Sequence, residues 1–406
     1  MLTAIIAIAT IGLTIWLMSR DVNIGIVLLV DSVIVAIATQ MPFTVSLSAA
    51  AKGALSERCI GTIAILVLIM ILERTMRDEG MLSSLAQNLK QLVGNGKAVA
   101  YLMPAVIGML PSPGGARFSC PMVEEVAGNR SSQETKAFVN YWFRHVWQDC
   151  FFLYPSAIAA SKILGLNVFQ VSLPVMAFGV FHAWVGWMMT RREVEALPHV
   201  EAGSRKEAWR GFGKAVFPVV EIILLYMALN QLHVPFDLEI ASVITLATLF
   251  TVRRLSPGKI GGIVKKAFQP RYILIIFGVM IFMEIFTQSG LVNQMLTAMT
   301  VLGLPKEVFF VLLPMVAGIS SGFSLSTISL TFPILAPMGL TANLLYVACA
   351  YVSGFIGNMI TPMHLCGVMT SEFFGVKVNR ILARVMRGEL AVLALVACVL
   401  LLLRFL

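Results

Sequence analysis

Hydrophobic residues along this chain gather into long runs that short polar segments separate. A helix needs about 20 mostly apolar residues to cross the hydrocarbon core of a membrane. Such runs lie at 2–18, 22–39, 60–76, 137–163 and 168–190 in the first half, and at 212–231, 236–252, 271–288, 341–371 and 386–405 in the second. The pattern predicts an all-α polytopic membrane protein with five transmembrane helices in each half.

Two further apolar stretches, 98–128 and 307–339, are interrupted in the middle by residues that break helices. The first carries Pro-Ser-Pro-Gly-Gly at 111–115, and the second carries Ser-Ser-Gly at 320–322. Irregular backbone is tolerated at membrane depth only where protein or a water-filled cavity covers it. We therefore expect each stretch to form a re-entrant hairpin that enters and leaves the membrane on one side.

The two halves match each other when the chain is shifted by 209 to 211 residues. In order, Glu73, Gly80, Gly94, Lys97, Pro104 and Gly108 recur as Glu284, Gly290, Gly303, Lys306, Pro314 and Gly318. This predicts a first repeat at 1–196, a linker at 197–211 and a second repeat at 212–406, with broken helices at about 137–163 and 341–371. Because five crossings is an odd number, the second repeat should be inverted. Broken segments at matching positions of two halves indicate a transporter's binding site.

Composition supports a membrane protein, because 58% of the residues are hydrophobic and only 13% are charged. Soluble domains carry about 25% charged residues. The first apolar run lacks a basic region and a small-residue cleavage site, so we expect a retained helix and not a signal peptide. The six cysteines show no CxxC spacing, which predicts neither a disulfide framework nor a metal site.

The net charge of +9 follows from basic residues in a few loops, and no nucleic-acid role is needed to explain it. On the predicted topology, 23 of the 30 Lys and Arg residues lie on one side and five on the other, while Arg117 and Arg144 fall at membrane depth. Because basic loops stay in the cytoplasm, the linker is expected there and both termini outside. The expected location is the cytoplasmic membrane of a prokaryote.

Two segments resemble a known superfamily. The run from Gly322 to Pro333, GFSLSTISLTFP, resembles the Ser-Asn-Thr hairpin tip of the ion transporter superfamily, which includes dicarboxylate/sodium symporters, citrate transporters and gluconate permeases. The segment GNMITP at 357–362 resembles the break in the following helix. PSPGGARFS at 111–119 is typical of an uncharacterised ten-span membrane family of bacteria and archaea placed in that superfamily.

The resemblance implies secondary active transport of a small organic anion, a carboxylate, by an elevator-type motion in a homodimer. Neither tip contains the Ser-Asn-Thr triplet, so the sodium sites of the dicarboxylate symporters do not carry over and the coupling ion is sodium or a proton. We expect no cofactor and no metal other than sodium, and no partner besides the anion, membrane lipid and a second copy of the chain.

The candidate site lies at the hairpin tips and helix breaks, because a broken helix exposes unpaired N–H groups at one end and unpaired C=O groups at the other. The residues predicted to bind substrate are Ser112, Gly114, Gly115, Arg117, Ser119, Ser324, Ser326, Thr327, Asn358 and Thr361. The residues predicted to take part in ion coupling are Asp149, Ser320, Ser321 and Asn358.

The charged candidates have alternative interpretations. Arg117 offers a fork suited to a carboxylate, but it also has acidic neighbours in the sequence with which it could form an ion pair. Asp149 is either a coupling carboxylate or the partner of Arg144. His145 and His364 fit packing roles, and Glu73 and Glu284 fit a structural role at the hairpin bases.

An ion channel and an intramembrane enzyme are the alternative functions. The sequence contains no HExxH motif, and none of its serines lies in a recognisable nucleophile motif with a paired base. We therefore expect the protein not to be an enzyme.

Overall fold

The computed structural model describes residues 13, 16–17, 20, 22–94, 96–109, 116–127, 131–148, 150–195, 204–291, 294, 297, 303 and 305–405, and of Arg117 and Phe118 the backbone alone. These residues form helices and turns, with no strand among them. The first half holds α2 (Ile24–Ala38), α3 (Phe43–Leu55), α4 (Glu57–Asp78), α5 (Met81–Val93), α6 (Gly96–Gly108), α7 (Ala116–Val126), α8 (Gln133–His145), α9 (Pro155–Leu164) and α10 (Val168–Thr190). The second holds α11 (Arg205–Gln231), α12 (Asp237–Val252), α13 (Pro257–Ala267), α14 (Pro270–Gln288), α16 (Lys306–Ser321), α17 (Ser324–Leu335), α18 (Leu344–Ile360), α19 (Leu365–Phe374) and α20 (Val378–Phe405), with two short 3₁₀ turns, η1 (Ala336–Met338) and η2 (Leu340–Ala342).

Six helical stretches in the described part of the chain are long and apolar enough to cross a membrane. They are Phe43–Asp78, Val168–Thr190, Arg205–Gln231, Pro270–Gln288, Leu344–Phe374 and Val378–Phe405. Their outer faces carry large exposed apolar side chains such as Phe43, Leu224 and Leu402. An apolar surface of this kind fits a lipid environment, so the chain is an all-helical, membrane-embedded protein.

The helix over 43–78 is longer than the sequence predicted. The apolar run at 60–76 marks only its second part, and a loop was expected before it. In the structure, α3 leads into α4 at Ser56, whose hydroxyl caps α4 by accepting from the Cys59 N–H at 3.1 Å. Apolarity alone missed α3, because its 13 residues are too few to span a membrane and Lys52 interrupts its apolar residues.

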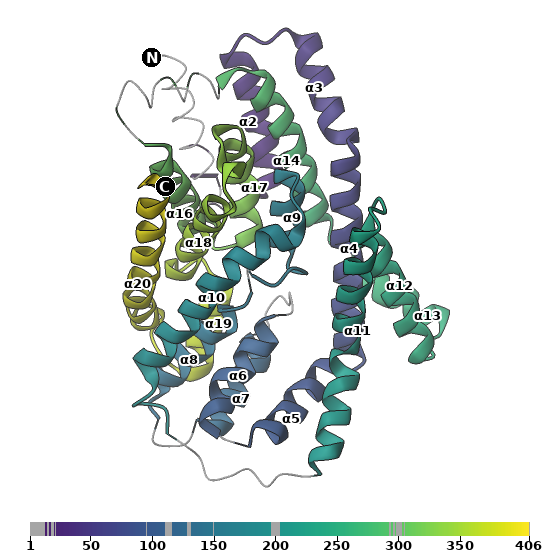
Figure 1. Cartoon of the computed structure of the whole chain (residues 1–406), viewed down its shortest axis with the longest axis vertical. Coiled ribbons are helices and arrows are strands. Elements are labelled where there is room, and N and C mark those ends of the chain that lie inside the picture. Colours follow the sequence, from purple (N-terminus) through teal and green to yellow (C-terminus); the bar gives the residue numbers. More distant parts are fainter. Residues whose placement is uncertain are drawn as a thin grey trace.

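The helices fall into two groups that lie side by side (Figure 1). The framework group comprises α2–α5 and α11–α14, in which α14 contacts α2 and α3, and α11 contacts α5 and α12. The hairpin group comprises α6–α10 and α16–α20, in which α18 contacts α16, α10 and α20. Each half contributes to both groups. Within the hairpin group the halves interlock, because α9 packs on α17, and α19 packs on α7 and α8.

Helices of the hairpin group recur along the chain. Adding 210 to the bounds of α9 gives 365 and 374, which are the bounds of α19, and the same shift moves the start of α10 to that of α20. Equivalent contacts recur as well. A Cβ on Gly108 of α6 would overlap the carbonyl oxygen of Arg144, and a Cβ on Gly318 of α16 would overlap that of Gly354. The contact of Gly318 with Gly354 therefore repeats that of Gly108 with Arg144, with both residues shifted by 210 positions.

Candidate functional site

The tip of the second hairpin packs against a break in the neighbouring helix. Helix α16 ends at Gly322, which has a left-handed φ of 59°, and α17 starts two residues later. Helix α18 ends at Ile360 and α19 begins at Leu365. A Cβ on Gly322 would lie 2.8 Å from the carbonyl carbon of Met363 and 2.9 Å from the His364 nitrogen, so only glycine permits this approach.

A polar network joins this tip to α18. The Asn358 carbonyl accepts a hydrogen bond from the Thr327 hydroxyl at 3.0 Å, and its amide donates to the Ser324 hydroxyl at 3.0 Å. The Ser321 and Thr327 hydroxyls lie 3.0 Å apart. Thr327 and Asn358 are each 1% exposed, so these polar groups are held inside the protein. The structure therefore brings together Ser321, Ser324, Thr327 and Asn358, four residues that the sequence predicted for the site.

The other predicted residues of the second half lie close to this network in the chain. Ser326 is buried in the first turn of α17, and Thr361 is the buried first residue of the break, where its hydroxyl accepts from the Met363 N–H at 3.3 Å. Ser320 instead donates to the Val316 carbonyl of its own helix at 2.9 Å. Ser320 thus satisfies its helix, as hydroxyls in spanning helices commonly do.

Much of the predicted first-half site lies outside the described residues. Ser112, Gly114, Gly115 and Asp149 are not described, nor is the side chain of Arg117. Ser119 is buried in α7 and donates to the Ala116 carbonyl at 3.4 Å.

Cys120, the residue after Ser119, belongs to a set of hydrogen bonds that links the interior of the first half to the second half. The amide of Asn140 on α8 lies 3.1 Å from the Cys120 sulfur of α7 and 3.0 Å from the Thr370 hydroxyl of α19. Tyr141, the next residue of α8, donates its hydroxyl to the Met359 carbonyl of α18 at 3.0 Å. These contacts fix the break of α18 and α19 against the first broken helix.

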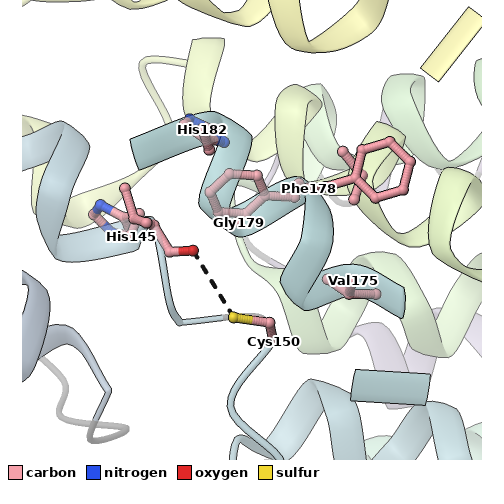
Figure 2. A pocket seen from close by; sticks show the side chains of 9 residues that line it. His145, Cys150, Val175, Phe178, Gly179 and His182 are labelled. Atoms are coloured by element: carbon pink, nitrogen blue, oxygen red, sulfur yellow. Dashed lines mark hydrogen bonds between the residues drawn. The ribbon is translucent and has the colours of Figure 1, made fainter. Parts of the chain in front are cut away.

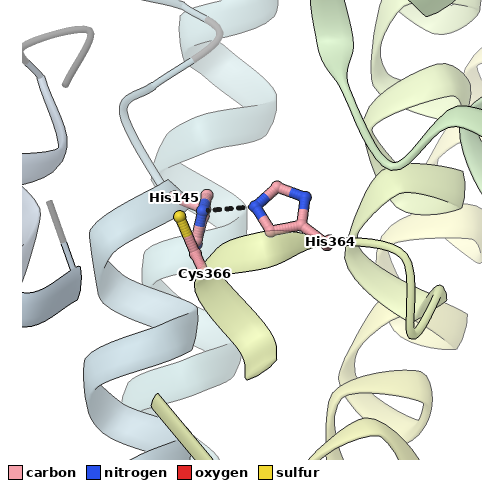
Figure 3. A group of neighbouring side chains, drawn as sticks. All are labelled: His145, His364 and Cys366. Atoms are coloured by element: carbon pink, nitrogen blue, oxygen red, sulfur yellow. Dashed lines mark hydrogen bonds between the residues drawn. The ribbon is translucent and has the colours of Figure 1, made fainter. Parts of the chain in front are cut away.

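Two histidines meet where the two broken helices approach each other (Figure 3). His145 is the last residue of α8, and His364 immediately precedes α19. Their Nε2 atoms lie 3.0 Å apart, and Cys366 lies beside them (Figure 3). One ring nitrogen of each histidine and the Cys366 sulfur all lie within 4.8 Å of one another.

A second buried pair connects α10 with α20. His182 Nε2 lies 3.1 Å from Glu389 Oε1, and both side chains are at most 3% exposed. The His182 ring packs against the rings of Trp142 and Phe355, at centroid distances of 4.2 and 5.2 Å. Apolar rings therefore surround a carboxylate–imidazole pair within the hairpin group.

A small cavity separates this pair from the two histidines (Figure 2). It is lined by His145, Val146, Cys150, Val175, Phe178, Gly179, His182, Val352 and Phe355. Its volume of about 20 Å³ leaves room for one water molecule.

The sequence did not predict the roles of Cys366, His182 and Glu389. A carboxylate near the start of the apolar run at 386–405 was the available signal for Glu389, since such groups are costly in membranes and usually functional. Glu73 and Glu284 were expected to have a structural role at the hairpin bases. In the structure, Glu73 pairs with Arg77 of the same helix, and Glu284 pairs with Lys52 of α3.

Comparison with known proteins places the chain in a family. The sequence matches no curated protein, whereas the model of a family described as "Protein of unknown function (DUF401)" matches residues 2–403. Since that match spans nearly the whole sequence, this membrane-embedded chain belongs to the DUF401 family.

Proposed function

We propose that the protein is a secondary active transporter of a small organic anion, a carboxylate, in the cytoplasmic membrane of a prokaryote. One observation carries the proposal: the hairpin tip at Gly322 is inserted into the break between α18 and α19, and buried polar side chains line the contact. Interrupted helices at membrane depth are a known construction of transporter binding sites.

The chemistry of the tip favours an anion. Among the described residues, no side chain caps the first turn of α17 or of α19, and the two helices start close together at Gly322 and His364. Free N–H groups at a helix start attract negative charge, and two such starts add their effects. Ser324 and Thr327 offer hydroxyls beside them, and Arg117 is proposed as the guanidinium that binds the carboxylate.

The two helix groups suggest how access alternates. An elevator motion would slide the hairpin group, which holds the candidate site, along the framework group. The repeat supports this proposal, because two inverted copies would exchange conformations and so open the site to either side in turn. The exposed apolar face of the framework group, with Phe43 and Leu55, is proposed to pack in a homodimer and against lipid.

Coupling requires a group that binds the driving ion. The Glu389–His182 pair is a candidate for proton coupling, because a buried carboxylate in a membrane is costly unless its charge is used. Asp149 remains the other proposed carboxylate. For sodium, the oxygens of Ser320, Ser321 and Asn358 are the candidates.

The test is uptake by purified protein in liposomes, with radiolabelled mono-, di- and tricarboxylates offered under an imposed proton or sodium gradient. We expect one of these anions to accumulate only when a gradient is present. Rapid conductance without a gradient would support a channel instead.

The Asn358→Ala variant addresses the site itself. It removes both hydrogen bonds to the tip, each worth about 1–3 kcal/mol when a buried partner is left unpaired, so the apparent affinity should fall about tenfold or more. Ser353→Ala is the matched control, because Ser353 is buried in the same helix and its hydroxyl bonds only the Cys349 carbonyl at 2.7 Å. Equal transport by both variants would argue against this site.

A further inference from the structure

Three side chains that commonly bind transition metals converge in the hairpin group. His145 ends α8, His364 precedes α19, and Cys366 lies in the first turn of α19. Their three donor atoms lie within 4.8 Å of one another. Figure 3 shows both imidazoles and the thiol close together, with a hydrogen bond between one nitrogen of each ring. Imidazole and thiolate are the ligands that zinc and copper prefer.

The tautomer of His145 favours a ligand. Its Nδ1 lies 2.6 Å from the Tyr141 carbonyl, which can only accept, so Nδ1 carries the proton. The Nε2 lone pair therefore faces His364 and Cys366. Metal-binding histidines usually donate their other N–H to a carbonyl or carboxylate in this way, which fixes the ring and raises its basicity.

The spacing also suits a metal ion. In a tetrahedral zinc site with Zn–N bonds of about 2.0–2.1 Å, two ligand nitrogens lie about 3.3 Å apart. The His145 and His364 Nε2 atoms are 3.0 Å apart, so a small widening would admit the ion. Three protein ligands leave a fourth position for water or another ligand.

The three ligands are buried to different degrees. His145 is 1% exposed and His364 is 8% exposed, whereas Cys366 is only partly buried. Met363 and Leu365, on either side of His364, are 43% and 56% exposed. The thiol is thus less deeply buried than the two imidazoles, which are fixed inside.

We infer that His145, His364 and Cys366 form a binding site for a thiophilic d-block cation, with Zn²⁺ as the reference ion. The cation would bind the Nε2 atoms of both histidines and the Cys366 thiolate. The thiol proton is released to solvent, and the proton of His364 moves from Nε2 to Nδ1, which frees its Nε2 lone pair for the cation. Since one ligand comes from the first broken helix and two come from the second, the ion would tie the two breaks together. This inference goes beyond the transport proposal and does not depend on it.

The first experiment measures metal content. Tag-free protein in detergent is stripped with a chelator, reloaded with Zn²⁺ and separated from free metal, and we expect one zinc per chain. Co²⁺ then serves as a visible probe, because a thiolate ligand gives a sulfur-to-cobalt charge-transfer band. The band should disappear in Cys366→Ser, and the Co²⁺ affinity should fall at least about tenfold in His145→Gln. Cys398→Ser, which alters an exposed cysteine of α20, should behave as the wild type.

A second measurement uses the unaltered protein, so it does not depend on whether a variant folds. Alkylation of each cysteine is followed by peptide mass spectrometry with and without Zn²⁺. Zinc should protect Cys366 and leave the labelling of Cys398 unchanged. If zinc leaves Cys366 equally reactive, or if Cys366→Ser keeps the full cobalt spectrum, the site is not a metal site and the histidines are only hydrogen-bonded. Neither result involves uptake, so the transport proposal is tested separately.

Discussion

Two buried side chains of the hairpin group lie against a side chain that can carry the opposite charge. Glu389 faces His182, and Lys136, whose side chain is 2% exposed, pairs with Glu124 at 2.8 Å. Removing one partner of a buried pair commonly costs about 3–5 kcal/mol, because the other charge is left uncompensated. Such pairs hold the helices in place, and the Glu389–His182 pair is the one proposed above for proton coupling.

Glu389→Gln tests proton coupling. The amide keeps the size and hydrogen-bonding capacity of the side chain but cannot take up a proton. In liposomes with an imposed pH gradient, we expect accumulation of the transported anion to fall at least about tenfold, equivalent to ~1.4 kcal/mol of driving force, while exchange at equal pH persists. Glu134→Gln is the control, since Glu134 lies 3.8 Å from Arg380 at a more exposed position. Unchanged proton-driven accumulation would exclude Glu389 from coupling.

Glu193, just beyond α10, links three helices and should make stability depend on pH. Partial burial raises the pKa of its carboxyl. Hydrogen bonds from Thr135 and Arg384, together with the Arg384 charge, lower that pKa by more than burial raises it, so the net shift is downward. A depressed pKa means that the stabilisation is present above the ordinary value of about 4.3 and is lost as the pH falls through the folded-state pKa.

We therefore expect the thermal midpoint of the wild type to approach that of Glu193→Gln as the pH falls from 6 to 3. The difference should be small, because the Glu193 side chain is 46% exposed and solvent screens the pair. Thermal unfolding followed by tryptophan fluorescence across this range measures it. A difference that stays constant with pH would show that Glu193 contributes no titrating stabilisation.

At the scale of elements, the second predicted hairpin lies where the structure has two helices separated by a short break. It predicted a hairpin over 307–339 with a break at Ser320–Gly322, and α16 and α17 cover Lys306–Leu335 with the break at Gly322 and Phe323. Glycine and serine at the tip carry that signal, because they end helices within an apolar run. Helix α3 was missed, since its 13 residues fall short of the length by which hydropathy identifies a membrane-crossing run.

The close crossing of α16 and α18 predicts a sharp dependence on glycine. A Cβ on Gly318 would overlap the Gly354 carbonyl and lie 2.9 Å from the Asn358 nitrogen, and backbone cannot move aside easily. Gly318→Ala should therefore lower stability by about 1–3 kcal/mol. Gly261→Ala in α13 is the control, because nothing lies within 4 Å of its added Cβ. The thermal unfolding midpoint of Gly261→Ala should stay the same or rise, because alanine favours helices. Equal midpoints for the two variants would contradict the packing described.

At the scale of the whole molecule, residue spacing could predict the breaks but not what meets at them. His145 and His364 are 219 residues apart, and their contact depends on how the two halves interlock. Each histidine alone fits a packing role, and Cys366 alone is a small apolar residue. The polar network at Asn358 was easier to predict, because its members lie in one half and near visible helix breaks.

The proposed inversion of the halves predicts opposite exposure for equivalent positions. Lys97 and Lys306 start α6 and α16 and match each other in the repeat. In intact cells, a membrane-impermeant maleimide should label Lys306→Cys, and it should label Lys97→Cys only after the membrane is opened. Peptide mass spectrometry separates these sites from the native cysteines. Labelling of both from the same side would mean that the copies are parallel and would remove the basis of the elevator proposal.

Each half of the chain supplies one histidine of the contact between His145 and His364. Under the 210-residue shift, His145 corresponds to Phe355 and His364 to Tyr154, so neither half carries both imidazoles at its own break. Each break therefore contributes one imidazole of the pair, and the pair forms only where the end of α8 in the first half packs against the residues before α19 in the second.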